Sequence, residues 1–591
     1  MRLVDQIQQN VQKFAIDKHG TQIDVVDIQP TKKDHHGDLT VVVFPLLRFI
    51  KSKPADLANS LGIYLQTHIE KVKAFDVIQG YLNLIIDDVY YLGFLNDIQY
   101  PENFGIKPVT VASKKILVEY SSPNTNKPLH LGHIRNNLLG ASISQLLTSA
   151  GFKVHKTQII NDRGIHICKS MVAWKAMGNG ETPESTGEKG DALVGRYYVA
   201  FNKIYKKQLA ELIASGIHEE EANSQVPIQL EAQEMLRAWE AGDENIRALW
   251  AQMNAWVYNG FAQTYRQLGV SFDSYYYESD TYLLGKDIIE KNISTGVFFK
   301  KDDGSVWCDL SNEGLDEKLV LRADGTSVYI TQDLGTALLR YKDHSDMNGM
   351  VYTVGNEQDY HFKVLFLILN KLGFDWAKQL HHLSYGMVDL PSGKMKSREG
   401  TVVDADGLIQ EMFDTAQNIT TSLGKIDGLD EFEKKELYKK IGIGALKYHI
   451  LKVDPTKSIL FNPKESIDFK GNTGPFIQYA YARIQSIIKQ SNISIGKVSI
   501  EITLESKEKE LIKWLELYPQ TIENAADQYS PALVANYVYE LVKRFNAYYQ
   551  EVVILCDDEQ TRQFRVCLAS QVGYVIQSGM RILGIECPNQ M

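Results

Sequence analysis

The chain has 591 residues, of which 44% are hydrophobic and 23% charged, and its formal net charge is −10. Since a domain usually holds about 100–200 residues, this length excludes a single hydrophobic core, and the composition excludes disorder as the main state. The acidic balance disfavours a protein that coats nucleic acid by bulk electrostatics. It leaves room for an enzyme that recognises a nucleic acid by shape, through local basic faces.

The five cysteines are scattered and form no Cys-x-x-Cys motif. This pattern predicts neither a disulfide framework nor a zinc site, and reduced thiols packed as small hydrophobic side chains are expected. The first ten residues lack an apolar signal core, and the most apolar stretches are too short to span a membrane. We therefore expect a cytoplasmic protein.

Residues 1–110 form a predicted α+β domain. Apolar residues at its start recur at helical spacing: Leu3, Ile7, Val11 and Phe14. Strands are expected over 23–28, 39–44 and 75–86, and a helix over 54–69. Residues 101–108, with a proline at each end, are expected to link this domain to the next.

Residues 111–465 are predicted to form a doubly wound α/β domain split by a helical insertion. A strand at 116–120, a polar loop and a helix over 132–150 give the order in which nucleotide-binding folds begin. The insertion covers about residues 170–270, and the composition of 178–191 predicts a mobile loop within it. The second half of the sheet is expected from strands at 305–310, 328–331, 350–354 and 382–387, which alternate with helices at 334–341 and 362–372.

Residues 466–591 are predicted to form an all-α bundle. Ser530 followed by Pro531 is typical of a helix start. Apolar stripes at four-residue spacing are expected to pack in its core: Leu533, Tyr537, Leu541 and Phe545, then Leu568, Val572, Ile576 and Met580.

The first motif with chemical content is His130-Leu131-Gly132-His133, where the polar loop meets its helix. A helix N-terminus presents free N–H groups and a partial positive charge, which suit a phosphate. Gly132 removes a side chain where a flat base could lie against the backbone. The two imidazoles could donate hydrogen bonds to phosphate oxygens.

The second motif, Gly393-Lys394-Met395-Lys396-Ser397-Arg398-Glu399-Gly400, follows the last predicted strand of the sheet. It is not a Walker A loop, because Gly386 and Gly393 are too far apart and Met395 stands where that loop carries a Ser or Thr. Taken alone, it is equally typical of a solvated turn.

In this order, the two motifs resemble the signatures of the class I aminoacyl-tRNA synthetases. The segment Glu119–His133 resembles the arginyl-tRNA synthetase version of the first signature. Further resemblances to that family lie in Asn161-Asp-Arg-Gly164, Asp324-Gly-Thr326 with Tyr329 and Asp333, Gln358-Asp-Tyr-His361, Gly471–Ala480 and Leu583–Pro588. The resemblance runs from about residue 114 to the end, and less specifically over the first 110 residues.

The resemblance implies a fold and a reaction. The fold class is a split Rossmann-type α/β catalytic domain at 111–465 with a signature loop at 393–400. An appended tRNA-contacting α+β domain (1–110) precedes it, and an all-α anticodon-binding bundle (466–591) follows. The implied enzyme activates arginine with ATP, only in the presence of tRNA, and passes it to the 3′ end of tRNA(Arg). We expect a monomer that uses ATP with Mg²⁺, without zinc or an organic cofactor.

The resemblance also implies residue roles. His130 and His133 should bind the phosphates in the transition state, and Lys394 should neutralise the leaving pyrophosphate. The usual second lysine of the loop is missing, and either Lys127 or Lys396 could replace it. Contacts with ATP are expected from Pro123, Leu131, Gly132, Gly386, Met387, Val388, Met395, Ser397 and Arg398. Contacts with arginine are expected from Glu119, Ser122, Asn124, Tyr329, Asp333 and Gln358, and contacts with tRNA from Gln478, Tyr479 and Arg483.

Specificity for arginine demands carboxylates, because a guanidinium is permanently charged and presents its donors as a planar fork. Asp333 is the first choice for this role. Three other interpretations stay open: a class I synthetase for another amino acid, a nucleotidylyltransferase with a His-x-Gly-His motif, and a non-catalytic tRNA-binding paralogue. The first would usually carry zinc cysteines or a large editing insertion, the second would not need the helical tail, and the third would lose the signatures.

Overall fold

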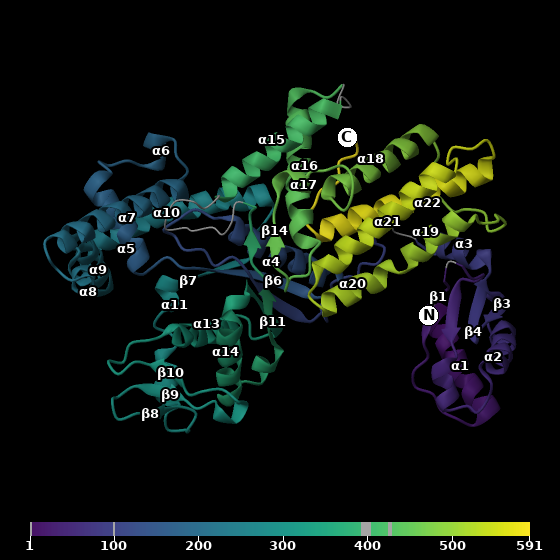
Figure 1. Ribbon diagram of the computed structural model, residues 1–591, viewed down its shortest axis with the longest axis horizontal. Helices are drawn as coiled ribbons and strands as arrows, with labels where there is room; N and C mark the ends of the chain where they lie inside the picture. The colour runs from purple at the N-terminus through teal and green to yellow at the C-terminus, as the bar shows by residue number, and fades with distance from the viewer. Residues whose placement is uncertain (1–2, 33, 99–100, 392–403, 424–427) are drawn as a thin grey trace. The chain divides into compact units, whose positions relative to one another are not determined.

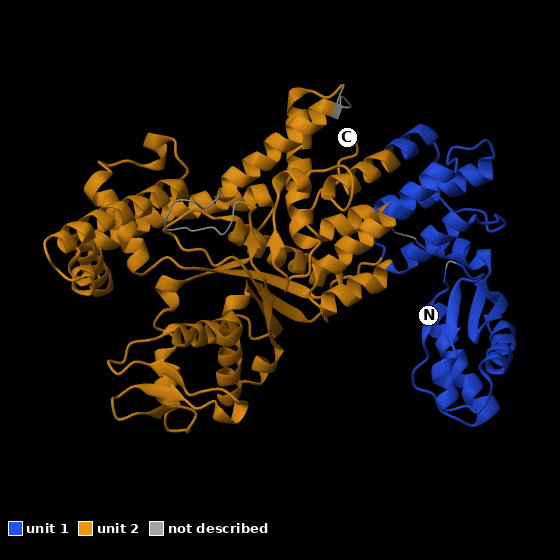
Figure 2. Cartoon of the chain, viewed as in Figure 1, with its two compact units in different colours: residues 1–104, 486–517, 543–574 blue, residues 105–485, 518–542, 575–591 orange. Residues whose placement is uncertain are grey.

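The computed structural model describes residues 3–32, 34–98, 101–391, 404–423 and 428–591 (Figure 1). The chain divides into two compact units (Figure 2): unit 1 comprises residues 1–104, 486–517 and 543–574, and unit 2 comprises residues 105–485, 518–542 and 575–591. None of the helices in the described part has both the length and the apolar composition that crossing a bilayer requires.

The N-terminal part of unit 1 contains an antiparallel sheet in the strand order β1-β2-β4-β3. Its last two strands form a hairpin whose turn residues, Gln79 and Gly80, both have positive φ, at 51° and 84°, as a tight two-residue turn requires. The prediction of a strand at 23–28 is wrong for all but its last residue, since β1 starts at Ile28. The elements are α1 (Leu3–His19), β1 (Ile28–Pro30), β2 (Leu39–Val42), α2 (Pro54–His68), β3 (Val72–Ile78), β4 (Tyr81–Ile86) and α3 (Asp88–Asp97).

A buried carboxylate holds this N-terminal fold to the helical part of unit 1. Asp38, which is 6% exposed, accepts a hydrogen bond from the Ile86 N–H at 2.7 Å. It also forms ion pairs with Lys509 and Lys513 of α19 (Ser506–Glu516). Because a buried charge that loses its partners is costly, these contacts fix the N-terminal fold on α19.

The centre of unit 2 is a five-stranded sheet in the order β12-β11-β5-β6-β7, in which every neighbouring pair is parallel (Figure 1). β5 is the middle strand. The strands that follow it in the chain, β6 and β7, lie on one side of it, and the later strands β11 and β12 lie on the other side. This is the doubly wound order, and it confirms the predicted α/β fold class. The strands are β5 (Lys115–Glu119), β6 (Lys153–Ile160), β7 (Ser274–Tyr277), β11 (Met347–Gly355) and β12 (Leu380–Tyr385).

Helices connect these strands and form the insertion. α4 (Leu131–Ser149) lies between β5 and β6, and α5 (Ile165–Met177) follows β6. The predicted helical insertion is confirmed, and the segment 178–191 contains one short helix and the start of another. The insertion helices are α6 (Pro183–Thr186), α7 (Gly190–Ala214), α8 (Glu219–Gln225), α9 (Pro227–Ala241) and α10 (Glu244–Leu268).

The predicted strand at 305–310 exists, but its assignment to the parallel sheet is wrong. It forms β9 (Val306–Cys308) of a separate antiparallel sheet, between β8 (Phe299–Lys300) and β10 (Lys318–Leu321). This small sheet packs with α13 and α14 around a common apolar cluster. The nearby helices are α11 (Glu278–Thr281), α12 (Lys286–Lys291), α13 (Tyr329–Asp343) and α14 (Asp359–Lys371).

The predicted strand at 328–331 is wrong, because these residues begin α13. The run Val-Tyr-Ile-Thr has high strand propensity, but two contacts override it. The Thr331 hydroxyl accepts a hydrogen bond from the Val328 N–H at 3.2 Å, and Ile330 is buried in the apolar cluster. A side-chain cap and burial therefore decide the conformation here.

The remaining elements of the chain are mainly helical. The predicted helix start at Ser530-Pro531 is confirmed, since α21 begins at Pro531. The elements are β13 (Val388–Asp389), α15 (Ala405–Leu423), α16 (Glu431–Leu451), β14 (Ile459–Leu460), α17 (Pro463–Ser466), α18 (Gly474–Ser491), α19, α20 (Tyr518–Asp527), α21 (Pro531–Glu551) and α22 (Glu559–Ile582). The second predicted stripe is fully or almost fully buried: Leu568, Val572, Ile576 and Met580.

Gly140 marks the closest approach of α4 to Tyr120, the residue after β5. A Cβ at position 140 would lie 2.2 Å from Tyr120 Cγ. Gly140→Ala should therefore lower the free energy of unfolding by about 1–3 kcal/mol, measured by urea denaturation. Gly93→Ala is the control, because a Cβ at that helical position meets nothing within 4 Å. Equal losses in the two variants would contradict this account of the α4 packing.

Candidate active site

The candidate site lies at the carboxyl-terminal edge of the parallel sheet. Ligands of doubly wound folds bind outside this edge where the strand order reverses, here between β5 and β11. An isolated parallel bridge between Asn124 and Asn161 holds the first signature loop there. In it, the Thr125 N–H donates to the Asn161 carbonyl at 3.1 Å, and the Asn161 N–H donates to the Pro123 carbonyl at 3.0 Å. The bridge extends the sheet beyond the end of β5. It places Ser122 and Asn124, which are predicted to contact arginine, just outside the edge of the sheet.

The two imidazoles of the first signature are fixed at the start of α4. Nδ1 of His130 accepts a hydrogen bond from the Gly132 N–H at 3.1 Å, and Nδ1 of His133 accepts one from the His130 N–H at 3.1 Å. The ring centroids are 3.9 Å apart. Since a nitrogen that accepts a hydrogen bond carries no proton, both neutral rings carry theirs on Nε2. Each imidazole is thus left with one N–H donor, on Nε2.

Burial keeps both imidazoles neutral. It lowers the pKa of His130 to about 4, and the nearby Lys127 ammonium adds to this effect. Burial also lowers the pKa of His133 well below its usual value, with contributions from His130 and Lys127. At pH 7 the rings are therefore neutral donors. The positive charge of Lys127 acts on both rings. Lys127 therefore lies close enough to the imidazoles for its predicted role, which is to replace the missing second lysine of the signature loop.

The predicted ATP contacts lie around this pair. Leu131 is fully buried, so that only its backbone could meet a ligand, and Gly132 is half-buried. On the approach to the second signature, Gly386 and Met387 follow β12, Met387 is 54% exposed, and Val388 is buried in β13. Lys394, Met395, Lys396, Ser397 and Arg398 lie outside the described residues, so their roles stay predictions. Beyond them, the Ala405 N–H donates to the Leu129 carbonyl at 2.8 Å, next to the first signature.

Two predicted arginine contacts lie one turn apart on α13. Tyr329 is 81% exposed, and the Asp333 side chain is 42% exposed. Oδ2 of Asp333 accepts a hydrogen bond from Nε2 of His361 at 2.6 Å. His361 belongs to α14, whose first turn follows the exposed Gln358. The structure therefore links Asp333 to the helix that Gln358 precedes, and leaves part of the Asp333 carboxylate open to a ligand.

Glu119, also predicted to contact arginine, has an internal partner. It ends β5 and forms an ion pair with Arg340 of α13, and both side chains are almost fully buried. Burial raises the pKa of the Glu119 carboxyl, and the Arg340 guanidinium opposes this shift. Glu119 therefore already neutralises the guanidinium of Arg340. Its contact with the substrate arginine stays a prediction.

Two carboxyl groups at this edge received no role in the sequence analysis: Asp162, which lies in the Asn161–Gly164 motif, and Glu278. Asp162, just after β6, accepts hydrogen bonds from the Ser279 N–H at 2.9 Å, the Ser279 hydroxyl at 2.8 Å and the Tyr258 hydroxyl at 3.0 Å. These bonds fix the turn that carries Glu278, the first residue after β7. Burial raises the pKa of Glu278 to about 7; Arg163 opposes this shift, and Asp162 and Asp333 add to it. Glu278 and Asp333 are therefore close enough to repel each other.

The three predicted tRNA contacts of α18 differ in their exposure. Gln478 is fully buried, and its Nε2 donates to the carbonyls of Lys440 at 3.1 Å and Glu586 at 2.7 Å. Tyr479 and Arg483 are half-buried and lie one turn apart, with the Arg483 guanidinium 5.1 Å from the Tyr479 ring centroid. Only the latter two present side chains that a ligand could reach.

Family models match three successive parts of the chain. The family model described as "tRNA synthetases class I (R), catalytic domain" matches residues 101–462. The "DALR anticodon binding domain" matches residues 477–591, and the "Arginyl tRNA synthetase N terminal domain" matches residues 1–86.

Similar proteins and structures extend over the whole chain. The chain is 58% identical to an arginine–tRNA ligase of Flavobacterium psychrophilum and 54% identical to one of Bacteroides thetaiotaomicron, each over 96% of both chains. The solved arginyl-tRNA synthetase of Thermus thermophilus shares the fold, with a TM-score of 0.80 at 23% identity over 100% of both chains. That of Plasmodium falciparum gives 0.75 at 18% identity over 99% of both chains. The chain therefore belongs to the arginyl-tRNA synthetases of class I.

Proposed function

We propose that this ATP-dependent arginine–tRNA ligase forms arginyl-adenylate at the carboxyl-terminal edge of its parallel sheet, and that it does so only with tRNA(Arg) bound. The observation that carries this proposal is the pair of neutral imidazoles at the start of α4, with their Nε2–H donors. The same sheet edge carries Asp333 and Glu278. The imidazoles suit a polyphosphate, and the carboxylates suit a guanidinium.

The first step makes the adenylate. An oxygen of the arginine carboxylate attacks the α-phosphorus of ATP, the bond to the bridging oxygen breaks, and pyrophosphate leaves with the electron pair. Negative charge on the phosphate oxygens is stabilised by His130 and His133, whose donors need no reorganisation. Lys127 adds positive charge beside them, and Lys396 is the alternative for this role. In the second step, a hydroxyl of the 3′-terminal ribose of tRNA attacks the arginyl carbonyl, and AMP leaves.

Magnesium enters the proposal with ATP. Among the described residues, no group of three or more His, Cys, Asp or Glu side chains is placed to hold a metal ion. The ion is proposed to arrive bound to the triphosphate. The enzyme is further proposed to act as a monomer in the cytoplasm, which sedimentation of the purified chain and fractionation of cells would test.

The raised pKa of Glu278 predicts how arginine recognition depends on pH. With a pKa of about 7, the Glu278 carboxyl is neutral below pH 7 and cannot pair with a guanidinium. Because kcat/KM reports the free enzyme, kcat/KM for arginine should fall about tenfold per pH unit as the pH drops below about 7. Glu278→Gln should lower the value that kcat/KM for arginine reaches at high pH, and it should abolish the fall of kcat/KM below pH 7. Aminoacylation assays across pH measure both effects. A fall that persists in Glu278→Gln would contradict the assignment.

Two surfaces are proposed to contact tRNA. On α18, Tyr479 can stack on an unpaired base while Arg483 binds phosphate. In the N-terminal fold, a small pocket is lined by Lys32, Tyr81 and Asn83, among others. Nδ2 of the buried Asn83 has no hydrogen-bond partner among the described residues, and the Lys32 ammonium lies 5.6 Å from the Tyr81 ring centroid. A ring, a cation and an unused amide donor are what an unpaired base requires.

Removing the ring from the N-terminal pocket should weaken tRNA binding. Tyr81→Ala is expected to raise KM for tRNA about 10-fold or more, because the stacking of one base on an aromatic ring contributes about 1–3 kcal/mol. Tyr81→Phe keeps the ring and should stay within about threefold of the wild type. Aminoacylation at varied tRNA concentration measures both. If Tyr81→Ala and Tyr81→Phe behave alike, the pocket does not take a base.

The reaction itself is tested by ATP–pyrophosphate exchange with each amino acid, with and without tRNA(Arg). The proposal predicts exchange with arginine alone, and only when tRNA is present. Exchange with arginine in the absence of tRNA would overturn the tRNA dependence. Exchange with another amino acid at a comparable rate would overturn the proposed selectivity for arginine.

A further inference from the structure

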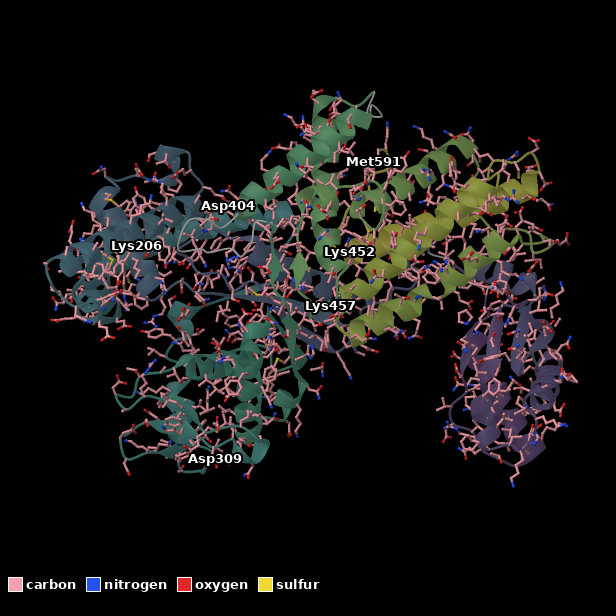
Figure 3. All side chains as sticks on the ribbon, viewed as in Figure 1. Lys206, Asp309, Asp404, Lys452, Lys457 and Met591 are labelled. Carbon is pink, nitrogen blue, oxygen red and sulfur yellow. The ribbon has the colours of Figure 1, made fainter. Side chains whose placement is uncertain are left out.

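Arg135, two residues after the second imidazole of the first signature, is almost fully buried in α4. Its guanidinium has no carboxylate within ion-pair distance among the described residues and donates to three backbone carbonyls. Nη1 donates to Met387 at 2.7 Å, and Nη2 donates to Pro455 at 3.0 Å and to Lys457 at 2.6 Å (Lys457 is labelled in Figure 3). The Tyr385 ring centroid lies 5.8 Å from its Cζ.

These carbonyls belong to the junction where β13 meets β14. The two short strands pair in parallel, and the Met387 carbonyl also accepts from the Ile459 N–H at 2.9 Å. Next to it, the Gly386 N–H donates to the Pro455 carbonyl at 2.9 Å. A Cβ at Gly386 would lie 2.6 Å from the carbonyl carbon of Lys457, so the two segments are in backbone contact. In the sequence, the second signature begins at Gly393, four residues after the end of β13.

The desolvation of the Arg135 guanidinium is not offset by a carboxylate partner among the described residues. Burial lowers the pKa of Arg135 to about 10, so that the guanidinium remains charged at pH 7. An apolar side chain could fill the same space without the cost of desolvating a charge. The planar fork of the guanidinium holds three carbonyls from two separate segments at fixed angles, which the freely rotating ammonium of a lysine would not do.

We propose that Arg135 is a positioning residue that holds the stem of the second signature, residues 386–389, against the helix that carries the imidazoles of the first, so that both signatures act on the same triphosphate. The two signatures come from opposite halves of the split domain, and Arg135 belongs to the helix that carries the first. Its contacts with Met387, Pro455 and Lys457 reach the stem of the second. This inference rests on the proposed function and names the residue that aligns its two phosphate-binding parts.

The test compares disruptions of this junction from its two sides, in ATP–pyrophosphate exchange with tRNA(Arg) present. Arg135→Gln should lower kcat about 10–100-fold, since a displacement of about 1 Å at a reacting centre can cost that much, while KM for arginine stays within about threefold. Gly386→Ala should likewise lower kcat and leave KM for arginine unchanged, because the new Cβ presses on Lys457 and forces the same two segments apart. The double variant should lose little more than the worse single variant, because both changes break one junction.

Lys447→Met is the matched control. Lys447 is another buried cation of unit 2, and it donates to a backbone carbonyl, that of Gly584. It should lower the melting temperature without changing kcat by more than about threefold. The proposal is overturned if folded Arg135→Gln keeps a kcat within threefold of the wild type, if KM for arginine rises in parallel with the loss of kcat, or if the two losses multiply in the double variant.

Should Arg135→Gln fail to fold, Gly386→Ala decides alone. A kcat loss at constant KM for arginine and for ATP supports the alignment role, and an unchanged kcat, or a rise in KM for ATP in parallel with the loss, overturns it. Failure of the proposed function would look different, because the wild type itself would then show no arginine-dependent exchange.

Discussion

Asp333→Asn is expected to raise KM for arginine by about 10²-fold or more, with KM for ATP changed by less than about threefold. The substitution keeps the size of the side chain, and its amide oxygen can still accept the hydrogen bond from His361 Nε2. What it removes is the negative charge that a bidentate pair with a guanidinium needs. Truncating one partner of such a pair in a desolvated site costs about 2–5 kcal/mol.

The control for Asp333→Asn is Asp346→Asn, which removes an acid at the opposite edge of the sheet. Asp346 is paired with Lys115, the first residue of β5, at 2.6 Å. This variant should match the wild type for both substrates. If Asp333→Asn raised KM for ATP as much as KM for arginine, Asp333 would be a general structural residue of the site rather than the arginine-selecting one.

His130→Asn should slow adenylate formation about 10²–10³-fold in single-turnover experiments. The reason is the loss of the Nε2–H donor, which the neutral imidazole offers at the place where charge develops. Asparagine is also a good residue for a helix N-cap, so the cap that His130 provides for the Gly132 N–H is retained. Thermal stability should therefore stay close to that of the wild type, while activation is lost.

His130→Ala separates the two roles of this residue. It should lose activation as His130→Asn does and should also lose about 0.5–2 kcal/mol of stability, because the cap is gone. An adenylation rate for His130→Asn within about threefold of the wild type would refute the donor role of Nε2–H.

The sequence allowed the prediction of the parallel sheet, the insertion and the position of the first signature at the start of a helix, because each depends on local periodicity or on a motif. It did not allow the prediction that Glu278 lies at the edge of the sheet that carries the candidate site. The preceding residues, Tyr275 to Tyr277, are typical of a strand, but nothing in the pattern indicated that this strand joins the sheet beside β6. A carboxylate gains its role here from the end of a strand, which only the topology reveals.

The same limit applies to the partners of charged residues. Glu119 was a reasonable candidate for contacting a guanidinium, but a sequence cannot tell a guanidinium of the substrate from that of Arg340, 221 positions later in the chain. Arg135 looks like an ordinary surface residue of a helix until the backbone carbonyls around it are known. Tertiary packing decides which distant residues pair with such charged side chains, and the local sequence does not indicate these partners.

The central claim, that this sheet edge joins cation-selecting carboxylates to a phosphate-binding pair of imidazoles, is tested most directly by charging tRNA(Arg) with arginine and with citrulline, its uncharged analogue of similar shape. The account predicts that the wild-type enzyme charges tRNA with arginine and prefers it over citrulline by about 10³-fold or more in kcat/KM, and that Asp333→Asn narrows this preference at least tenfold. A wild-type enzyme that charges both at similar rates, or a preference that is unchanged in Asp333→Asn, would contradict it.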